Sequence, residues 1–459
     1  MDWAICILLF ITSIILYLIL TEGFRSPNIS PDGTQYLQIA NNIIDNQPIL
    51  WIRPPGYPLL IILAKTFLTT QTPNMEIVYF QYLTSALTPV ITYLLTKKLT
   101  LKTSVSFGIS LLVIFNLQFI GYANTVLTES IVITLVMLLM FLFVNWIEKP
   151  SKNIFLYLFL SLSIISYFIK PIFLYLPFCY LILGFIYQSL NGHLNKNFFK
   201  KIYISVLALS IPILSWCSFN YLKRGFFSFD QVTVINKLGK SIQYGYLRTY
   251  PIKGNDNSEI REIKNLYLKG NTYLGPLVEE ALNIDDIFTS DYKLLEDINS
   301  KISDNKHLDF TKRTLRLYPE VLESIRNTSF FKGNRDLTIL KITEEIWNMS
   351  SAFSFFSITI AISTVFIIFF KKSYNQQFII LSTLLLTYLY FTSISTIAGF
   401  SEYSRLISPI AIINLIFFFL SFYFIYKCFK TLYIRIITKN KKFLNNHPIF
   451  STKTSRKKC

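Results

Sequence analysis

An all-α polytopic membrane protein with one external domain is the fold class that this sequence predicts, and three observations predict it. Of 459 residues, 52% are hydrophobic and only 15% are charged, whereas globular domains average about 25% charged residues. Apolar runs of about 20 residues, enough to cross a hydrocarbon core, recur along the chain. One long polar region, residues 222–350, interrupts them. We therefore expect about 10 spans, one further re-entrant or juxtamembrane segment, and a mostly helical α+β external domain.

The apolar runs set the positions of the expected spans. They lie near residues 2–20, 77–96, 103–121, 126–146, 153–170, 172–190, 202–221, 351–370, 376–398 and 406–426. No Lys or Arg precedes the first run and no small-residue cleavage site follows it, so we expect it to stay as an anchor and not to be removed as a signal peptide.

The net charge of +18 is unevenly distributed, and its distribution favours lipid over nucleic acid as the partner. From Lys427 to the end there are ten Lys or Arg residues and no Asp or Glu. A basic segment after a last span marks the cytoplasmic side and attracts anionic lipid. We therefore expect a cytoplasmic tail and no nucleic-acid partner.

Counting spans back from this tail places the other basic loops on the same side, as the positive-inside rule requires. Those loops carry Lys97, Lys98, Lys102, Lys149, Lys152, Lys196, Lys200, Lys201, Lys371 and Lys372. The same count places four segments outside, namely "GYANTVLTES", "FIKPIF", residues 222–350 and "SEYSRLISP". The expected location is therefore the plasma (inner) membrane, with many spans and an extracytoplasmic site.

One apolar segment, residues 57–70, does not fit this count if the N-terminus and the tail are both inside. The stretch "PLLIILAKTFL" is short, carries Lys65 and follows three prolines, which favours a membrane-parallel or re-entrant segment. The alternative is that this segment crosses the membrane and leaves the first loop cytoplasmic.

These patterns divide the chain into four parts. They are an N-terminal transmembrane module (1–221) with a first external loop (21–56), an external soluble domain (222–350), C-terminal spans (351–426) and a basic tail (427–459). The soluble domain has 19 basic and 18 acidic residues, so it has no polyanion-binding character. Its stretch "FSFDQVTVINKLGKSIQYGYL" is strand-like and turn-like, whereas "TKRTLRLYPEVLESIRNTSFF" has helical spacing broken at Pro319.

Acidic residues are rare outside the soluble domain, which holds 18 of the 26. The other eight are Asp2, Glu22, Asp32, Asp45, Glu76, Glu129, Glu148 and Glu402. Three of them, Asp32, Glu129 and Glu402, stand at outer span boundaries. An ionisable group near hydrocarbon is costly, so each is a candidate functional residue.

Asp32 also has a structural explanation. Ser30 can cap a helix, Pro31 can take its first position, and the acid would favour the helix dipole. The functional interpretation is that the following helix, with Tyr36 and Ala40 on one side, lies in the membrane interface and fixes Asp32 at the surface.

Glu129 and Glu402 have similar alternatives. Glu129 follows Thr128 at the start of a span, where capping and the helix dipole explain an acid. Glu402 and Arg405 are three residues apart and can pair with each other on a helix.

Two cations complete the external set. Arg53 in "RPPGYP" stands beside two prolines that fix the backbone, and its guanidinium can hydrogen-bond a phosphate bidentately; contact with lipid headgroups is the alternative. Lys170 precedes Pro171 in a short turn, where it can also extend to the interface without a partner. Three acids and three cations on one membrane face, Arg405 included, indicate a site and not chance capping.

Other chemistries lack their residues. The three histidines fall in an inner loop, the soluble domain and the tail, so no metal-ligand cluster is visible. There is no Gly-rich phosphate loop, no Ser-His-Asp set and no cysteine-based catalytic arrangement. We predict no cofactor and no metal ligands, and leave open a divalent cation held by carboxylates.

The order of these motifs resembles a known group of enzymes. An acid after the first span, an amphipathic helix, "RPPGYPLL", an acid in "TES", "KP" between spans and a late "SEYSRLISPI" are similar to the polytopic GT-C glycosyltransferases. The closest group is the one related to protein O-mannosyltransferases and the lipid A aminoarabinose transferase. The resemblance covers most of residues 1–220 and 350–426.

The resemblance implies roles for individual residues. Asp32 matches the catalytic aspartate of the first loop and Glu129 the acid of the second. Arg53 matches the basic residue before the paired prolines, and Arg405 the late basic residue near the donor phosphate, with Lys170 as a further phosphate ligand. Supporting positions would be Tyr36, Tyr57, Glu402 and Tyr403. Two departures are Gly33, where many members have a second acid, and Glu129, which is often Asp.

The resemblance implies a sugar transfer on the extracytoplasmic face. The donor would be a polyprenyl-phosphate-linked sugar, and the acceptor a hydroxyl of an envelope glycan, lipid or protein. Asp32 would act as general base and the reaction would invert the anomeric centre. The alternatives are a cell-envelope oligosaccharide polymerase or ligase, which the acid of the first loop and "RPPGYP" disfavour, and a transporter, which would show inverted repeats or charges at mid-span.

Overall fold

The computed structural model describes most of the chain. The described residues are 2–21, 27–47, 49, 53–100, 102–230, 232–252, 258–270, 274–283, 292–304, 306–317, 320–321, 338–370, 375–398 and 403–446. These residues form helices almost throughout, which confirms the all-α membrane class. The sheet that they form is one pair of two-residue strands, β1 (Asn28–Ile29) and β2 (Thr125–Val126).

The N-terminal part contains the helices α1 to α11 and one 3-10 turn. They are α1 (Asp2–Thr21), α2 (Pro31–Ile44), α3 (Gly56–Phe67), α4 (Met75–Ser85), α5 (Leu87–Thr100), α6 (Thr103–Ile114), α7 (Leu117–Ala123), α8 (Glu129–Glu148), α9 (Asn153–Ile169), η1 (Pro171–Phe173), α10 (Leu176–Leu190) and α11 (Lys196–Arg224). The C-terminal part adds α19 (Thr338–Ala352), α20 (Ser354–Phe370), α21 (Gln376–Ala398) and α22 (Tyr403–Asn446).

Six of the described helices are long and apolar enough to cross a membrane, or eight if each of two bent pairs is one span. The bent pairs are α6 with α7, at 53°, and α19 with α20, at 60°. Two of the ten expected spans lie outside this set. The run 77–96 divides into α4 and α5 at Ala86, and α9 has 17 residues, slightly fewer than the ~20 that a span needs.

Helix α8 is the centre of the bundle. Nearly all of its side chains are buried, and it contacts α4, α5, α9, α10, α21 and α22. A helix that is apolar on every side is stable when other helices surround it. The two ends of α8 are both acids, Glu129 and Glu148, so one acid stands at each end of the bundle core.

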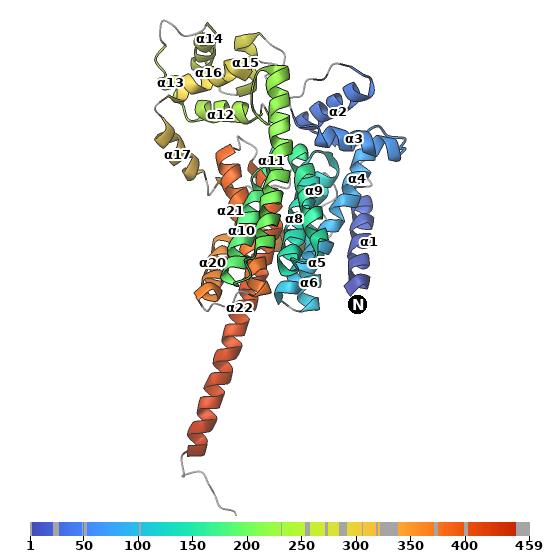
Figure 1. The fold of residues 1–459 in the computed structure, drawn as a ribbon, viewed down its shortest axis with the longest axis vertical. Helices are drawn as coiled ribbons and strands as arrows, with labels where there is room; N and C mark the ends of the chain where they lie inside the picture. Colours follow the sequence, from blue (N-terminus) through green and yellow to red (C-terminus); the bar gives the residue numbers. More distant parts are fainter. Residues whose placement is uncertain are drawn as a thin grey trace, which may run out of the picture.

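Helices α2 and α3 lie across one end of the bundle (Figure 1). Helix α3 has 12 residues, too few to cross a hydrocarbon core, and Lys65 in its last turn donates to the side chain of Asn41 at 3.0 Å. Most of segment 57–70 therefore belongs to a short helix that contacts α2, the helix that carries Asp32, and its membrane-parallel or re-entrant position stays a prediction.

The region between α11 and α19 forms a separate helical layer at the same end (Figure 1). Its helices are α12 (Val232–Gln243), α13 (Tyr246–Thr249), α14 (Ser258–Leu268), α15 (Leu274–Leu282), α16 (Tyr292–Ser303) and α17 (His307–Arg316). Helices α12 to α16 enclose a second hydrophobic core that includes Leu238, Ile263, Leu277, Leu295 and Ile298.

The prediction of strand within "FSFDQVTVINKLGKSIQYGYL" is wrong. Residues 232–243 form α12, whose buried residues Val234, Ile235, Leu238 and Ile242 recur every three or four positions. The β-branched residues suggested a strand, but their helical spacing decided the structure. In the second stretch α17 ends at Arg316, and Pro319 lies outside the described residues.

Candidate active site

The two predicted acids come from loops that the β1–β2 pair holds together. Asn28 pairs with Thr125 and Ile29 with Val126 in a parallel register. The backbone N–H of Asn28 also donates to Asn124 O at 3.1 Å. Because Asp32 follows β1 and Glu129 follows β2 by three residues, this short pairing brings both acids to one place.

The start of α2 follows the sequence expectation. The side chain of Ser30 accepts a hydrogen bond from Gly33 N at 2.9 Å, and Pro31 takes the first helical position. Ser30 Oγ also donates to Val126 O at 3.4 Å. The cap therefore fixes α2 against β2 and sets Asp32 in the first turn of the helix.

Gly33 is required by this close approach. A Cβ at Gly33 would overlap the backbone carbonyl oxygen of Val126, which cannot move like the tip of a flexible side chain. A second acid at this position, as the resemblance would have it, does not fit the space between α2 and β2. The site therefore has one carboxylate, that of Asp32, at the start of α2.

Glu129 is not held by the cap that we expected. Thr128 makes no side-chain capping bond to the helix backbone, and its hydroxyl donates to Glu129 Oε2 at 3.4 Å. The carboxylate of Glu129 is completely buried. Helix capping alone does not explain a fully buried carboxylate. Such a group is stable only when charged or hydrogen-bonding partners surround it.

Five predicted residues form one continuous network of ion pairs. Arg405 joins the two acids: its Nη2 lies 2.6 Å from Asp32 Oδ2, and its Nε lies 2.8 Å from Glu129 Oε1. Asp32 Oδ1 accepts from Arg53 Nη2 at 2.5 Å. Glu129 Oε1 also accepts from Lys170 Nζ at 2.8 Å. The first loop, α8, the α9–η1 turn and α22 thus meet at one point.

The surroundings of Arg53 fix its plane. Its Nε donates to Gln35 Oε1 at 3.0 Å and its Nη1 contacts Tyr36 Oη at 3.5 Å. The guanidinium also lies 5.1 Å from the centre of the Tyr36 ring, a cation–π geometry. Arg53 is therefore held by Gln35 and Tyr36, which lie on α2 about one turn after Asp32.

Within the described residues, the ion pairs of the network join two acids and three cations, so these five side chains sum to one positive charge. The side chains are 0% to 20% exposed, so water screens their charges little. Burial alone would raise the pKa of Asp32, but the charges of Arg53 and Arg405 outweigh it and hold this pKa below its ordinary value. Asp32 is therefore ionised at neutral pH.

The remaining predicted positions have different outcomes. Tyr57 is buried, packs edge-on against Tyr36 with ring centres 4.8 Å apart, and donates to Gln81 Oε1 at 2.5 Å. Tyr403 begins α22, and its side chain lies outside the described residues, as does all of Glu402. The predicted pairing of Glu402 with Arg405 therefore lies outside them too.

The sequence reasoning missed three polar residues near the network. Gln35 accepts from Arg53, and Gln81 donates to the carbonyl oxygens of Ala123 and Thr125 while it accepts from Tyr57. A glutamine within an expected span, as Gln81 is within the run 77–96, was a signal that could have been used. Gln35 gave none, because a polar residue on a surface loop is ordinary.

Asp230 is the third missed residue. It is buried and accepts from Thr233 N at 3.0 Å and from Thr233 Oγ1 at 2.9 Å, which is an N-cap for α12. Burial raises the pKa of Asp230, and these bonds and the charge of Arg53 counteract only part of that rise. In the sequence it was one of 18 acids in the soluble region, and nothing distinguished it.

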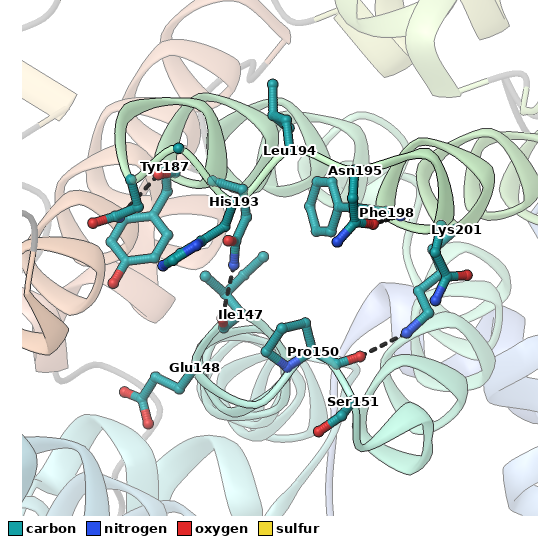
Figure 2. A pocket seen from close by; sticks show the side chains of 14 residues that line it. Ile147, Glu148, Pro150, Ser151, Tyr187, His193, Leu194, Asn195, Phe198 and Lys201 are labelled. Carbon is teal, nitrogen blue, oxygen red and sulfur yellow. Dashed lines mark hydrogen bonds between the residues drawn. The ribbon is translucent and has the colours of Figure 1, made fainter.

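A cavity of about 840 Å³ lies at the opposite end of α8 (Figure 2). It is lined by the ends of α8, α10 and α11, and three of its polar side chains bond neighbouring backbone. Lys201 Nζ donates to Pro150 O at 2.6 Å, Asn195 Oδ1 caps α11 at Phe198 N, and Gln188 Nε2 donates to Ile147 O. The cavity shares no residue with the ion-pair network.

Within the described residues, no group of three or more His, Cys, Asp or Glu side chains could hold a metal ion. The carboxylates of Asp32 and Glu129 are both engaged by cations. A divalent cation would have to displace a guanidinium or an ammonium there, so the residues present fit an anion better than a metal ion.

Comparisons with known proteins add little. No family model matches the chain, and no curated protein matches it. Among solved structures it is similar to the crystal structure of the Archaeoglobus fulgidus oligosaccharyltransferase in complex with zinc and sulfate, with 12% identity and a TM-score of 0.47. The match covers 94% of this chain and 51% of that one, so this chain spans about half the length of that protein.

Proposed function

We propose that this membrane protein is a glycosyltransferase of the GT-C type, acting on the extracytoplasmic face. It would transfer a sugar from a polyprenyl-phosphate donor to a hydroxyl of an envelope glycan, lipid or protein. The observation that carries the proposal is the network in which Arg405 joins Asp32 to Glu129, with Arg53 and Lys170 at its two ends.

The excess positive charge suits a lipid-linked phosphate. Guanidinium groups bind phosphate through paired, charge-assisted hydrogen bonds. Arg53 and Arg405 both contact Asp32, so a phosphate close to this carboxylate would be within reach of two guanidinium groups. Lys170, which bonds the same oxygen of Glu129 as Arg405 does, would add a third positive charge.

Transfer needs one base and one stabilised leaving group. The acceptor oxygen would form a bond to the anomeric carbon while the bond from that carbon to the phosphate oxygen breaks. The acceptor's proton would pass to Asp32, and the electron pair of the broken bond would stay on the phosphate. A single displacement of this kind inverts the anomeric centre.

The roles of the two acids follow from their burial. Asp32 is 20% exposed on its side chain, whereas Glu129 is not exposed at all. We assign Asp32 as the general base because an acceptor can reach it. Glu129 would orient Arg405 and Lys170 toward the donor, since its carboxylate oxygen Oε1 accepts from both.

The location of the network explains why such an enzyme would be a membrane protein. Glu129 and Arg405 stand at the ends of two candidate spans, and Asp32 lies on a helix across the end of the bundle (Figure 1). The reactive bond of a polyprenyl-phosphate sugar lies at the same level, beside the lipid headgroups. The polyprenyl chain of the donor would then lie between spans.

The test compares envelope glycans and glycolipids by mass spectrometry in cells with the wild type, a deletion, Asp32→Asn or Asp45→Asn. Asp45 is the matched control because it is an exposed acid at the other end of α2. Deletion and Asp32→Asn should both remove one sugar increment and accumulate polyprenyl-phosphate sugar, whereas Asp45→Asn should not. If Asp32→Asn behaves as the wild type while deletion does not, Asp32 is only a residue of the helix start and the proposal fails.

A further inference from the structure

Lys240 is a buried lysine that the proposed mechanism does not use. It lies in α12, outside the bundle, and it is 0% exposed. Its ammonium donates to the carbonyl oxygen of Thr396 and, at 2.8 Å, to that of Ile397. A buried charge of this kind persists only when nearby groups satisfy it.

The two acceptors belong to the last turn of α21, which ends at Ala398. The last four carbonyl groups of a helix have no partner within the helix, and a positive charge near them is favourable. Lys240 therefore supplies the C-terminal cap of α21 from another part of the chain. Helix α22 begins five residues after Ala398, at Tyr403, and Arg405 lies in its first turn.

The other end of α12 lies near the opposite side of the ion-pair network. Asp230 caps this end, and the neighbouring Phe229 packs on Phe168 with ring centres 5.7 Å apart. Phe168 precedes Lys170 by two residues. Trp216 Nε1 of α11 donates to Phe229 O at 2.9 Å. The N-terminal end of helix α12 is thus held close to Lys170, and its C-terminal part is held at the end of α21.

We propose that Lys240 is a positioning residue that fixes the outer end of α21 and, through it, the first turn of α22, so that Arg405 stays bonded to Asp32 and Glu129. The external layer would thereby support the geometry of the network. Burial lowers the pKa of Lys240 to about 8, so near neutral pH the side chain is still charged and needs the two carbonyl groups.

The contact itself can be tested without any assumption about the reaction. Hydrogen–deuterium exchange of the full chain in nanodiscs would compare Lys240→Met with Lys237→Met, an exposed lysine of the same helix. Lys240→Met should speed exchange at the end of α21 and in the first turns of α22 by about tenfold, and Lys237→Met should not. Lys240→Gln, which keeps one donor group, should fall between them. Equal exchange in Lys240→Met and the wild type would overturn the proposal.

The consequence for Arg405 rests on the proposed function and needs a double-mutant cycle. Binding of undecaprenyl phosphate, with undecaprenol as the control lipid, would be measured by native mass spectrometry. Lys240→Met should weaken binding about tenfold in the wild type but less than about threefold in Arg405→Lys, because residues that act through one another are not additive.

The two possible failures are distinguishable. An equal factor in both backgrounds would show that Lys240 does not act through Arg405. A wild type that binds undecaprenyl phosphate no better than undecaprenol would count against the proposed function, while the exchange experiment would still decide the contact.

Discussion

At the scale of single residues, Glu129 is the most constrained member of the network. Its carboxylate is fully buried and accepts from both Lys170 and Arg405. Removing one partner from a buried ion pair leaves an uncompensated charge, whereas the pair itself contributes little net stability. Glu129 is therefore expected to affect both folding and the position of the cations.

Glu129→Gln should lower the unfolding free energy by about 3 kcal/mol or more, because two cations lose their counter-charge. Thermal unfolding in detergent would measure it. Glu148→Gln is the control, since Glu148 ends the same helix and pairs with Lys98 at 2.7 Å far from the network. Similar losses in both variants, with activity kept in both, would mean that Glu129 is only a structural ion pair.

The pH dependence of activity should not contain Asp32 near neutrality. Its folded pKa lies below the ordinary value of 3.8. A depressed carboxyl pKa contributes stability that is present above the unfolded pKa and is lost as the pH falls through the folded pKa. Between pH 5 and 8 neither the charge of Asp32 nor its contribution to the free energy of unfolding should change. An acid limb of kcat/KM near pH 6 that disappears in Asp32→Glu would contradict this.

At the scale of elements, the contact of α2 with β2 sets the distance between the two acids. Gly33 allows this contact because a Cβ would overlap Val126 O. The strands β1 and β2 are only two residues long, so a small shift of α2 would displace Asp32 from Arg405.

Gly33→Ala should therefore reduce activity by about 100-fold, as misplacement by about 1 Å can do. Gly108→Ala is the matched control, because Gly108 lies in α6 with nothing within 4 Å of its Cβ position. That control should be neutral, or stabilising by about 0.5–1 kcal/mol as alanine replaces glycine in a helix. Unchanged activity in Gly33→Ala would show that α2 can move without effect on the site.

Local features of the elements could be predicted from the sequence, and distant contacts could not. The Ser30 cap and the Pro31 start of α2 depend on neighbours in the chain, so the residue types were sufficient. The bond between Asp32 and Arg405 joins residues 373 positions apart, and only their shared membrane face suggested it. Lys240 was missed for the same reason, because its partners are backbone carbonyls 156 and 157 positions away.

At the scale of the whole molecule, the ion-pair network and the basic extension of α22 lie at opposite ends of the bundle. Helices α2, α3 and α12 lie at one end, while the N-terminus of α1 and the extension of α22 lie at the other (Figure 1). Asp32 in the first turn of α2 places the ion-pair network at the first of these ends. Six basic residues from Lys427 to Lys442 belong to the extension of α22 at this second end. The positive-inside rule therefore predicts that this end is cytoplasmic.

Cysteine labelling would test this orientation. In a chain whose five cysteines have been replaced, Lys237→Cys on α12 and Lys430→Cys on α22 give one exposed position at each end. A membrane-impermeant maleimide added to intact cells should label the α12 position and reach the α22 position only after the membrane is permeabilised. The reverse pattern would place the ion-pair network on the cytoplasmic side, where a donor displayed on the outer face could not reach Asp32. The proposed transfer could then not take place on the extracytoplasmic face.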